Sequence, residues 1–148
     1  MRTLIILILV LIPNLSFAAY SAKIIQSNDF SARIKAQEIN LNSATTDHLI
    51  PIPSALSKYI VRRVTITNSS IDLSLSLATV GVFTSTGGGG TTIVTLGTVT
   101  GLTTSAKYID FTIAASDTLT SSTIYVRIGV AHGSAATADV YIDLQAIP

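Results

Sequence analysis

Apolar and polar residues alternate along most of the chain after residue 59. Apolar side chains occupy every second position in residues 64–66, 71–77, 109–113, 124–130 and 140–144. Because successive side chains of a strand point to opposite faces of a sheet, each stretch predicts a strand with one buried face and one solvated face. The β-branched residues 91–100 predict a further strand. After residue 50, no helical period of ten residues or more is visible.

Turn-forming residues separate these predicted strands. They lie at residues 68–70, 87–90, 101, 116–117, 121–122 and 133–134. Short strands with turn signals at this spacing are typical of two antiparallel sheets packed together. We therefore predict an all-β fold, an antiparallel β-sandwich that is jelly-roll-like.

The first 18 residues have the layout of a secretory signal peptide. Arg2 precedes the apolar run of residues 4–12, and Ser16 and Ala18 provide small side chains at the −3 and −1 positions of a cleavage site. A transmembrane helix needs about 20 apolar residues, and this run is much shorter. We expect cleavage near Ala18, export of the protein, and no membrane span in the mature chain.

The remaining chain divides at about residue 48. Residues 19–48 are polar and mixed, and they contain the only glutamate, Glu38. Pro51 and Pro53 then enforce an extended backbone. We expect an N-terminal arm over residues 19–48 and a β-sandwich domain over residues 49–148.

Charge is scarce, and this narrows the possible functions. Charged residues make up 11% of the chain, against about 25% in a typical soluble domain. Loss of Arg2 from the nine basic residues leaves eight, which balance the eight acidic residues. Nucleic-acid binding needs a clustered basic surface and is not expected. Sparse charge together with a high apolar content favours self-association, and we expect a homo-oligomer, with a trimer favoured.

The sequence offers little for catalysis or cofactor binding. The glycine run 87–90 lacks the lysine of a phosphate-binding loop and predicts a flexible hairpin tip. His48 and His132 lie in no zinc motif, and a triad of a serine with His132 and Asp139 lacks the GxSxG elbow. Calcium binding by scattered aspartates stays open. We expect no enzyme activity and no catalytic, cofactor-binding or metal-ligating residues.

Three tyrosines fall at outward positions of the predicted strands, namely Tyr108, Tyr125 and Tyr141. Aromatic rings with polar tips suit contacts with sugars, and the chain has no tryptophan to provide them. Ordinary cross-strand pairing on an exposed sheet explains the same positions. If the tyrosines lie on neighbouring strands, they form a contact patch. Arg62 and Arg63 are a second candidate edge for interaction.

Several short sequence segments, taken together, resemble a known kind of domain. They are LNS (41–43), IPIP (50–53), YIVRRV (59–64), GVFT (81–84) with the glycine run, IYVRI (124–128) and AHGSAATADVY (131–141). Together they resemble a small all-β domain of uncharacterised virion accessory proteins, decoration or fibre-like, of tailed bacteriophages and prophages. The glycine run and the small residues before Asp139 are the most specific parts.

This resemblance implies a non-enzymatic structural or binding β domain that acts like a phage virion accessory or decoration protein and self-associates. Phage capsids and tails assemble in the cytoplasm, so the signal peptide departs from the pattern and favours a secreted or periplasmic relative. The alternative is a secreted adhesin-like or glycan-binding module that uses exposed tyrosine faces. The expected location is the periplasm, the extracellular space or the virion surface. The expected partners are copies of this chain, virion or cell-surface proteins, or glycans.

Overall fold

A computed structural model describes residues 23–25, 31–103, 105–114 and 117–147. Its elements are β1 (Lys23–Ile25), β2 (Ser31–Asn40), β3 (Asp47–Pro51), β4 (Tyr59–Thr67), β5 (Thr79–Phe83), the 3-10 turn η1 (Thr86–Gly88), β6 (Thr92–Thr98), β7 (Tyr108–Phe111), β8 (Thr123–Ile128) and β9 (Thr137–Ala146). The expected signal peptide, residues 1–18, lies outside the described residues.

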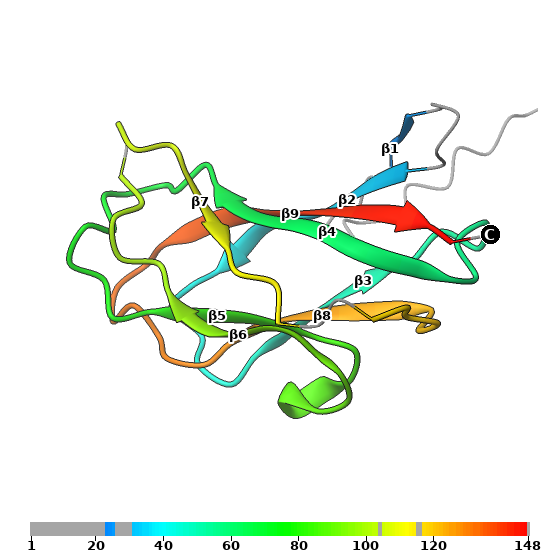
Figure 1. Cartoon of the computed structure of the whole chain (residues 1–148). Coiled ribbons are helices and arrows are strands. Elements are labelled where there is room, and N and C mark those ends of the chain that lie inside the picture. Colours follow the sequence, from blue (N-terminus) through cyan, green and yellow to red (C-terminus); the bar gives the residue numbers. More distant parts are fainter. Residues whose placement is uncertain (1–22, 26–30, 104, 115–116, 148) are drawn as a thin grey trace, which may run out of the picture.

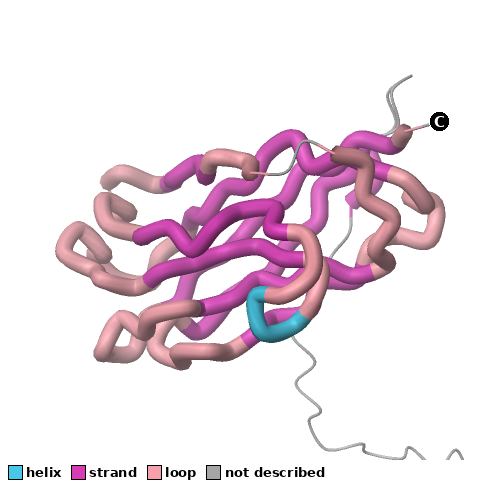
Figure 2. Tube along the Cα trace, turned by 60° about the horizontal axis from the view of Figure 1, so that its bottom comes forward, coloured by secondary structure: helices cyan, strands magenta, loops and turns pink. Residues whose placement is uncertain are grey.

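The strands form two sheets that face each other (Figure 1). Sheet A has the order β1-β2-β9-β4-β7, and sheet B has the order β3-β8-β5-β6. Neighbouring strands are antiparallel throughout both sheets. Figure 2 shows the strands of both sheets, with loops gathered at the two ends of the sandwich. The prediction of an all-β antiparallel sandwich is confirmed.

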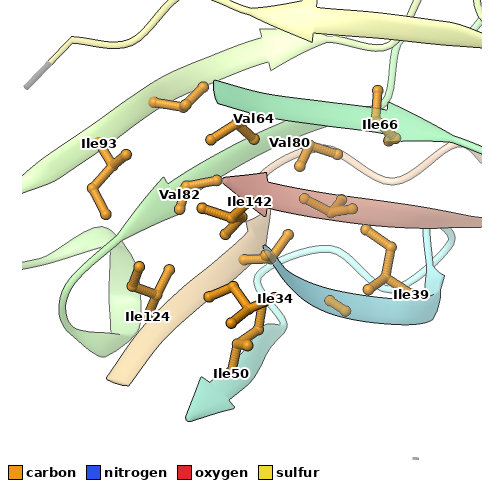
Figure 3. Packing of buried hydrophobic residues seen from close by; sticks show 14 of the residues in the cluster. Ile34, Ile39, Ile50, Val64, Ile66, Val80, Val82, Ile93, Ile124 and Ile142 are labelled. Carbon is orange, nitrogen blue, oxygen red and sulfur yellow. The ribbon is translucent and has the colours of Figure 1, made fainter. Parts of the chain in front are cut away.

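The inward side chains of both sheets form one apolar core (Figure 3). Val64 and Ile142 of sheet A face Val82 and Ile124 of sheet B, and all four are buried. Val64, Ile124 and Ile142 lie at the inward positions that the alternating pattern predicts, whereas the pattern did not predict β5, which contains Val82. Burying a side chain of this size stabilises the fold by about 1.5–3 kcal/mol, so the core holds the two sheets together without disulfides.

Residues 31–40, part of the expected N-terminal arm, form the internal strand β2 of sheet A instead. Ala32 and Ile34 are buried against the core, whereas Arg33 between them is exposed. The strand is hard to recognise because small alanines carry much of its apolar face. A β-bulge with a left-handed Glu38 (φ 51°) also interrupts its two-residue period. The expected domain boundary at residue 49 is therefore wrong, since the sandwich already includes β2.

The strand expected at residues 71–77 is a loop between β4 and β5. Leu73 is buried, but Leu75 and Leu77 are 92% and 75% exposed. The Asp72 carboxylate accepts a hydrogen bond from the Ser74 amide (2.8 Å). Such local bonds from an aspartate compete with strand pairing, and here they turn the chain away from the sheet.

The glycine run forms the tip of the β5–β6 hairpin, as predicted, and includes the short turn η1 (Figure 2). Gly87 and Gly88 have positive φ values of 70° and 77°, which glycine adopts without strain. The Gly87 amide donates a hydrogen bond to the Asp47 carboxylate (2.8 Å), which also pairs with Arg127 (3.0 Å). The tip is thus tied to the outer face of sheet B.

Candidate functional site

The outer face of sheet A contains an open hollow of about 260 Å³. Its lining comes from four neighbouring strands, β2, β9, β4 and β7. The lining residues are Arg33, Arg63, Thr65, Thr67, Tyr108 and Tyr141. We call this set of residues the sheet A hollow. Because side chains alternate along each strand, its lining residues all point away from the core.

The strand register brings these side chains into rows across the sheet. Tyr141 of β9 lies opposite Lys35 of β2 on one side and opposite Thr65 of β4 on the other. Thr65 in turn lies opposite Asp110 of β7. Residues more than 70 positions apart in sequence, such as Lys35 and Asp110, thus share one row of the sheet. Sequence alternation alone places each residue on a face but cannot supply this register.

A second row contains two arginines on either side of one aspartate. Asp143 of β9 lies opposite both Arg33 and Arg63. The Arg33 guanidinium binds the Asp143 carboxylate through two hydrogen bonds, Nε to Oδ1 (2.5 Å) and Nη2 to Oδ2 (2.9 Å). Paired parallel bonds of this kind fix the plane of the guanidinium as well as its position. Arg33 therefore presents its remaining N–H groups in a defined direction.

Arg63 forms the same type of pair with Asp110. Its Nε and Nη2 atoms donate to the two carboxylate oxygens at 2.9 Å and 2.6 Å, and the Thr65 hydroxyl donates to Oδ1 at 2.5 Å. The hydrogen bonds from Arg63, then that from Thr65, hold the pKa of Asp110 below its usual value. The hydrogen bond with Asp110 also raises the pKa of Arg63. Both groups therefore stay charged at neutral pH.

Tyr141 is half-buried and lies beside two cations. The Lys35 ammonium is 5.1 Å from the centre of the Tyr141 ring, and the Arg33 guanidinium carbon is 5.9 Å from it. Both distances lie within the range of about 6 Å for cation–π attraction. Tyr108, in contrast, is 61% exposed. The hollow thus combines one tyrosine fixed by its neighbours with one that is accessible to solvent.

Beside the hollow, Asp139 is a buried carboxylate whose side chain is 8% exposed. It accepts hydrogen bonds from Lys35 Nζ (2.8 Å), Asn68 Nδ2 (2.7 Å) and the Glu38 amide (2.9 Å). Burial alone would raise the pKa of Asp139, but the bonds from Asn68, Lys35 and Glu38 outweigh it and lower that pKa. The ion pair with Asp139 in turn raises the pKa of Lys35. Asp139 therefore fixes the lysine that lies over Tyr141.

The structure brings together three of the five residues predicted from sequence as contact residues. Tyr108, Tyr141 and Arg63 all line the hollow. Arg62 lies in a β-bulge of β4, next to Arg63, and its Nε donates a hydrogen bond to Gln145 Oε1 (2.6 Å). Tyr125 belongs to sheet B, between Leu49 and Phe83 in the register. The three tyrosines are therefore divided between two sheets and do not form one patch.

Sequence reasoning did not identify Arg33, Thr65 and Thr67 as lining residues. Arg33 was missed because its segment was expected to be an arm. The alternation of Ala32 and Ile34 with Arg33 and Lys35 is the signal that could have placed it on a strand. The threonines gave no signal, since threonine is common on any exposed β face.

The histidine considered for a catalytic triad and Asp139 have different hydrogen-bond partners. His132 Nδ1 is 2.8 Å from Ser76 Oγ, and the buried Ser76 also accepts the Ala78 amide (3.0 Å). Asp139 bonds instead to Lys35, Asn68 and Glu38. Within the described ranges, no three histidine or acidic side chains gather as metal ligands would.

No family model, no curated protein and no solved structure matches this chain. In the part of the chain that the structure describes, no helix has the length and apolar character needed to cross a membrane. Functional inference therefore rests on the side chains of the sheet A hollow.

Proposed function

We propose that this chain is a non-enzymatic binding domain that holds carbohydrate in the sheet A hollow. One observation carries the proposal: Tyr108 and Tyr141 from two separate strands meet Arg33 and Arg63 around one concavity. A concave site with aromatic rings and a few converging polar groups is the usual form of a small-ligand site.

The chemistry of the hollow suits a sugar. A sugar ring has apolar C–H faces and a rim of hydroxyl groups. The tyrosine rings offer apolar surface to such a face, while their hydroxyls and the arginine–aspartate pairs offer donors and acceptors to the rim. The volume of about 260 Å³ lies just below the range of roughly 300–1,000 Å³ for small-molecule pockets. An open site of this size suits one or two sugar units of a longer glycan.

The carboxylates around the hollow are poorly suited to glycoside hydrolysis. Hydrolysis normally requires one carboxyl group that keeps a proton at working pH and donates it to the leaving group. Asp110 has the opposite property, because Arg63 and Thr65 lower its pKa. Asp143 is bound through both of its oxygens to Arg33. These pairs favour holding a sugar over cleaving it.

The proposal is tested by screening the protein on an array of neutral and acidic glycans, followed by titration of any glycan that binds. Tyr108→Ala and Tyr141→Ala should each weaken binding by about tenfold or more, since buried aromatic contacts carry a large share of binding energy. Tyr125→Ala, on the other sheet, is the matched control and should bind like wild type. Absence of binding to every glycan, or unchanged binding in both hollow variants, would contradict the proposal.

A second candidate function is the structural one that the sequence resemblance implies: a self-associating virion accessory protein. It is favoured by the exposed apolar side chains Leu75 and Leu77 of the β4–β5 loop and Val130 after β8, whose carbonyl accepts the Thr79 amide at the start of β5. Exposed apolar groups near one another are common at interfaces between copies of a chain. Light scattering of wild type and the Leu75→Ser, Leu77→Ser double variant tests it. An oligomer that becomes monomeric in the variant supports this function, and a monomeric wild type contradicts it.

We also infer that the sandwich is a jelly roll. The inference is supported by four antiparallel strand pairs, β5 with β6, β4 with β7, β3 with β8 and β2 with β9. A long hairpin with its turn between β5 and β6 has these four pairings, and rolling it up gives two four-stranded sheets. The two sheets would then be β2-β9-β4-β7 and β3-β8-β5-β6, with β1 added at an edge.

A further inference from the structure

We infer that the sheet A hollow selects uncharged sugars, and that its two arginine–aspartate pairs each recognise adjacent hydroxyl groups of one sugar ring. This inference rests on the proposed carbohydrate binding and specifies the ligand. It is carried by the pairing of the charges on this face, by the hydrogen-bonding capacity left on the paired groups, and by the exposure of Tyr108.

The charges around the hollow are already matched. Arg33 pairs with Asp143, Arg63 with Asp110, and Lys35 with Asp139. A carboxylate or sulfate group on a ligand would come close to the like charge of Asp143 at Arg33, or to that of Asp110 at Arg63. To bind the guanidinium in the same bidentate way, it would have to displace the internal carboxylate. The hollow is therefore built with no uncompensated cation among its lining residues to attract an anion.

The paired groups keep hydrogen-bonding capacity of both kinds. A guanidinium has five N–H donors, and Arg33 and Arg63 each use two sites, Nε and Nη2, on their carboxylates. The Nη1 group of each arginine takes no part in these bonds. The carboxylate oxygens of Asp143 can likewise accept further bonds. Each pair thus presents donors beside acceptors.

Adjacent hydroxyls of a sugar fit this arrangement, because each hydroxyl both donates and accepts a hydrogen bond. One hydroxyl can accept from the guanidinium while its neighbour donates to the carboxylate, and the ion pair stays intact. An acidic group only accepts, so it would leave the aspartate oxygens facing a like charge. The exposed ring of Tyr108 offers the apolar surface for the sugar face. The ring of Tyr141 already lies beside Lys35 and Arg33.

The experiment measures binding of immobilised protein to neutral polysaccharides (mannan, dextran, galactan) and to acidic ones (hyaluronan, heparin, polysialic acid). Each is measured at about 20 mM and about 500 mM salt, because screening weakens attraction between exposed charges. We expect binding to at least one neutral polysaccharide, with less than about a twofold change in affinity between the two salt concentrations. Binding confined to acidic polysaccharides and lost at high salt would overturn the inference while leaving the proposed function intact. Binding to neither class would contradict the proposed function itself.

Variants separate hydroxyl recognition from simple charge. Arg63→Lys keeps the positive charge but loses the planar fork, and Asp110→Asn keeps the shape but loses the anion. Both side chains are about half exposed, so each variant should fold, which circular dichroism checks. We expect each to weaken binding of the neutral polysaccharide by about tenfold. Lys107→Gln, beside Tyr108 in sequence but outside the hollow lining, is the control and should bind normally. Unchanged binding in both Arg63→Lys and Asp110→Asn would overturn the inference.

Discussion

At the scale of single residues, Asp139 is the buried charge that fixes its neighbours beside the sheet A hollow. It accepts bonds from Lys35, Asn68 and the Glu38 amide, which come from β2 and from the end of β4. Because buried charges are costly unless they are fully paired, removing one partner leaves the others unsatisfied. Asp139 thus stabilises both the β2 bulge and the position of Lys35 over Tyr141.

Replacing this carboxylate should cost stability in a pH-dependent way. The pKa of Asp139 is lower in the folded state than in the unfolded state, so its ionised form stabilises the fold above the unfolded value of about 4. That stability is lost as pH falls through the lowered folded pKa. We expect Asp139→Asn to cost about 1–3 kcal/mol at pH 7 and less at pH 3.

Urea unfolding of both proteins at the two pH values provides the measurement. Asp117→Asn, at an exposed loop position, is the control and should unfold like wild type at both pH values. An Asp139→Asn deficit as large at pH 3 as at pH 7 would show that the carboxylate charge is not responsible.

His48 should make the fold sensitive to mild acid. Its Nε2 atom is buried and has no hydrogen-bond partner among the described residues, and burial lowers the His48 pKa in spite of the nearby Asp47. The unfolded chain therefore takes up a proton more readily than the folded chain, and stability falls as pH drops below about 6.5. We expect wild type to lose more stability than His48→Val between pH 7 and pH 5, measured by thermal unfolding. Equal losses in the two proteins would contradict the expected role of His48.

At the scale of elements, alternation predicted several strands of the sandwich but did not predict β3 or β5. The apolar positions of β8 and β9, such as Ile124 and Ile142, are buried as expected. Two of the failures of alternation have local reasons. In β2, the bulge at Glu38 shifts the period by one residue. In residues 71–77, the hydrogen bond that the Ser74 amide donates to the Asp72 carboxylate favours a turn over a strand. Neither a β-bulge nor a hydrogen bond between a side chain and the backbone is visible in a hydrophobic pattern.

Substitutions in the β4–β5 loop test directly whether residues 71–77 form a loop rather than a strand. Leu73→Ala should destabilise the protein by about 2–5 kcal/mol, because Leu73 is fully buried. Leu75→Ala and Leu77→Ala should each change stability by less than about 0.5 kcal/mol, since both side chains are exposed. Chemical unfolding of the monomeric protein measures all three. Equal costs at the three positions would instead indicate the continuous strand that the alternation predicts.

The hairpin tip should depend on one distant side chain. Asp47 of β3 holds the Gly87 amide and pairs with Arg127. Asp47→Ala removes both interactions, so we expect a stability loss of about 1–2 kcal/mol and faster hydrogen exchange at the Gly87 amide. Unchanged exchange at Gly87 would show that the tip holds its shape without Asp47.

At the scale of the whole molecule, the sequence predicts the fold class and part of the candidate site. Tyr108 and Tyr141 were identified from outward positions on their strands, and Arg63 as part of a basic pair with Arg62. The hollow contains all three. Their convergence depends on β9 lying between β2 and β4, with β7 beside β4. Strand order is set by the packing of the whole core and not by any one segment. That is why Tyr125, with the same local pattern, belongs to the other sheet.

The central claim is that the outer face of sheet A binds an uncharged glycan. Its most direct test is a titration of the isotopically labelled protein with a neutral oligosaccharide, followed by amide chemical shifts in two-dimensional NMR spectra. We predict saturable shifts at Tyr141, Thr65 and Tyr108, with sheet B residues such as Tyr125 unaffected. Shifts centred on sheet B or on the Leu75–Leu77 loop, or no shifts with any neutral oligosaccharide, would contradict it.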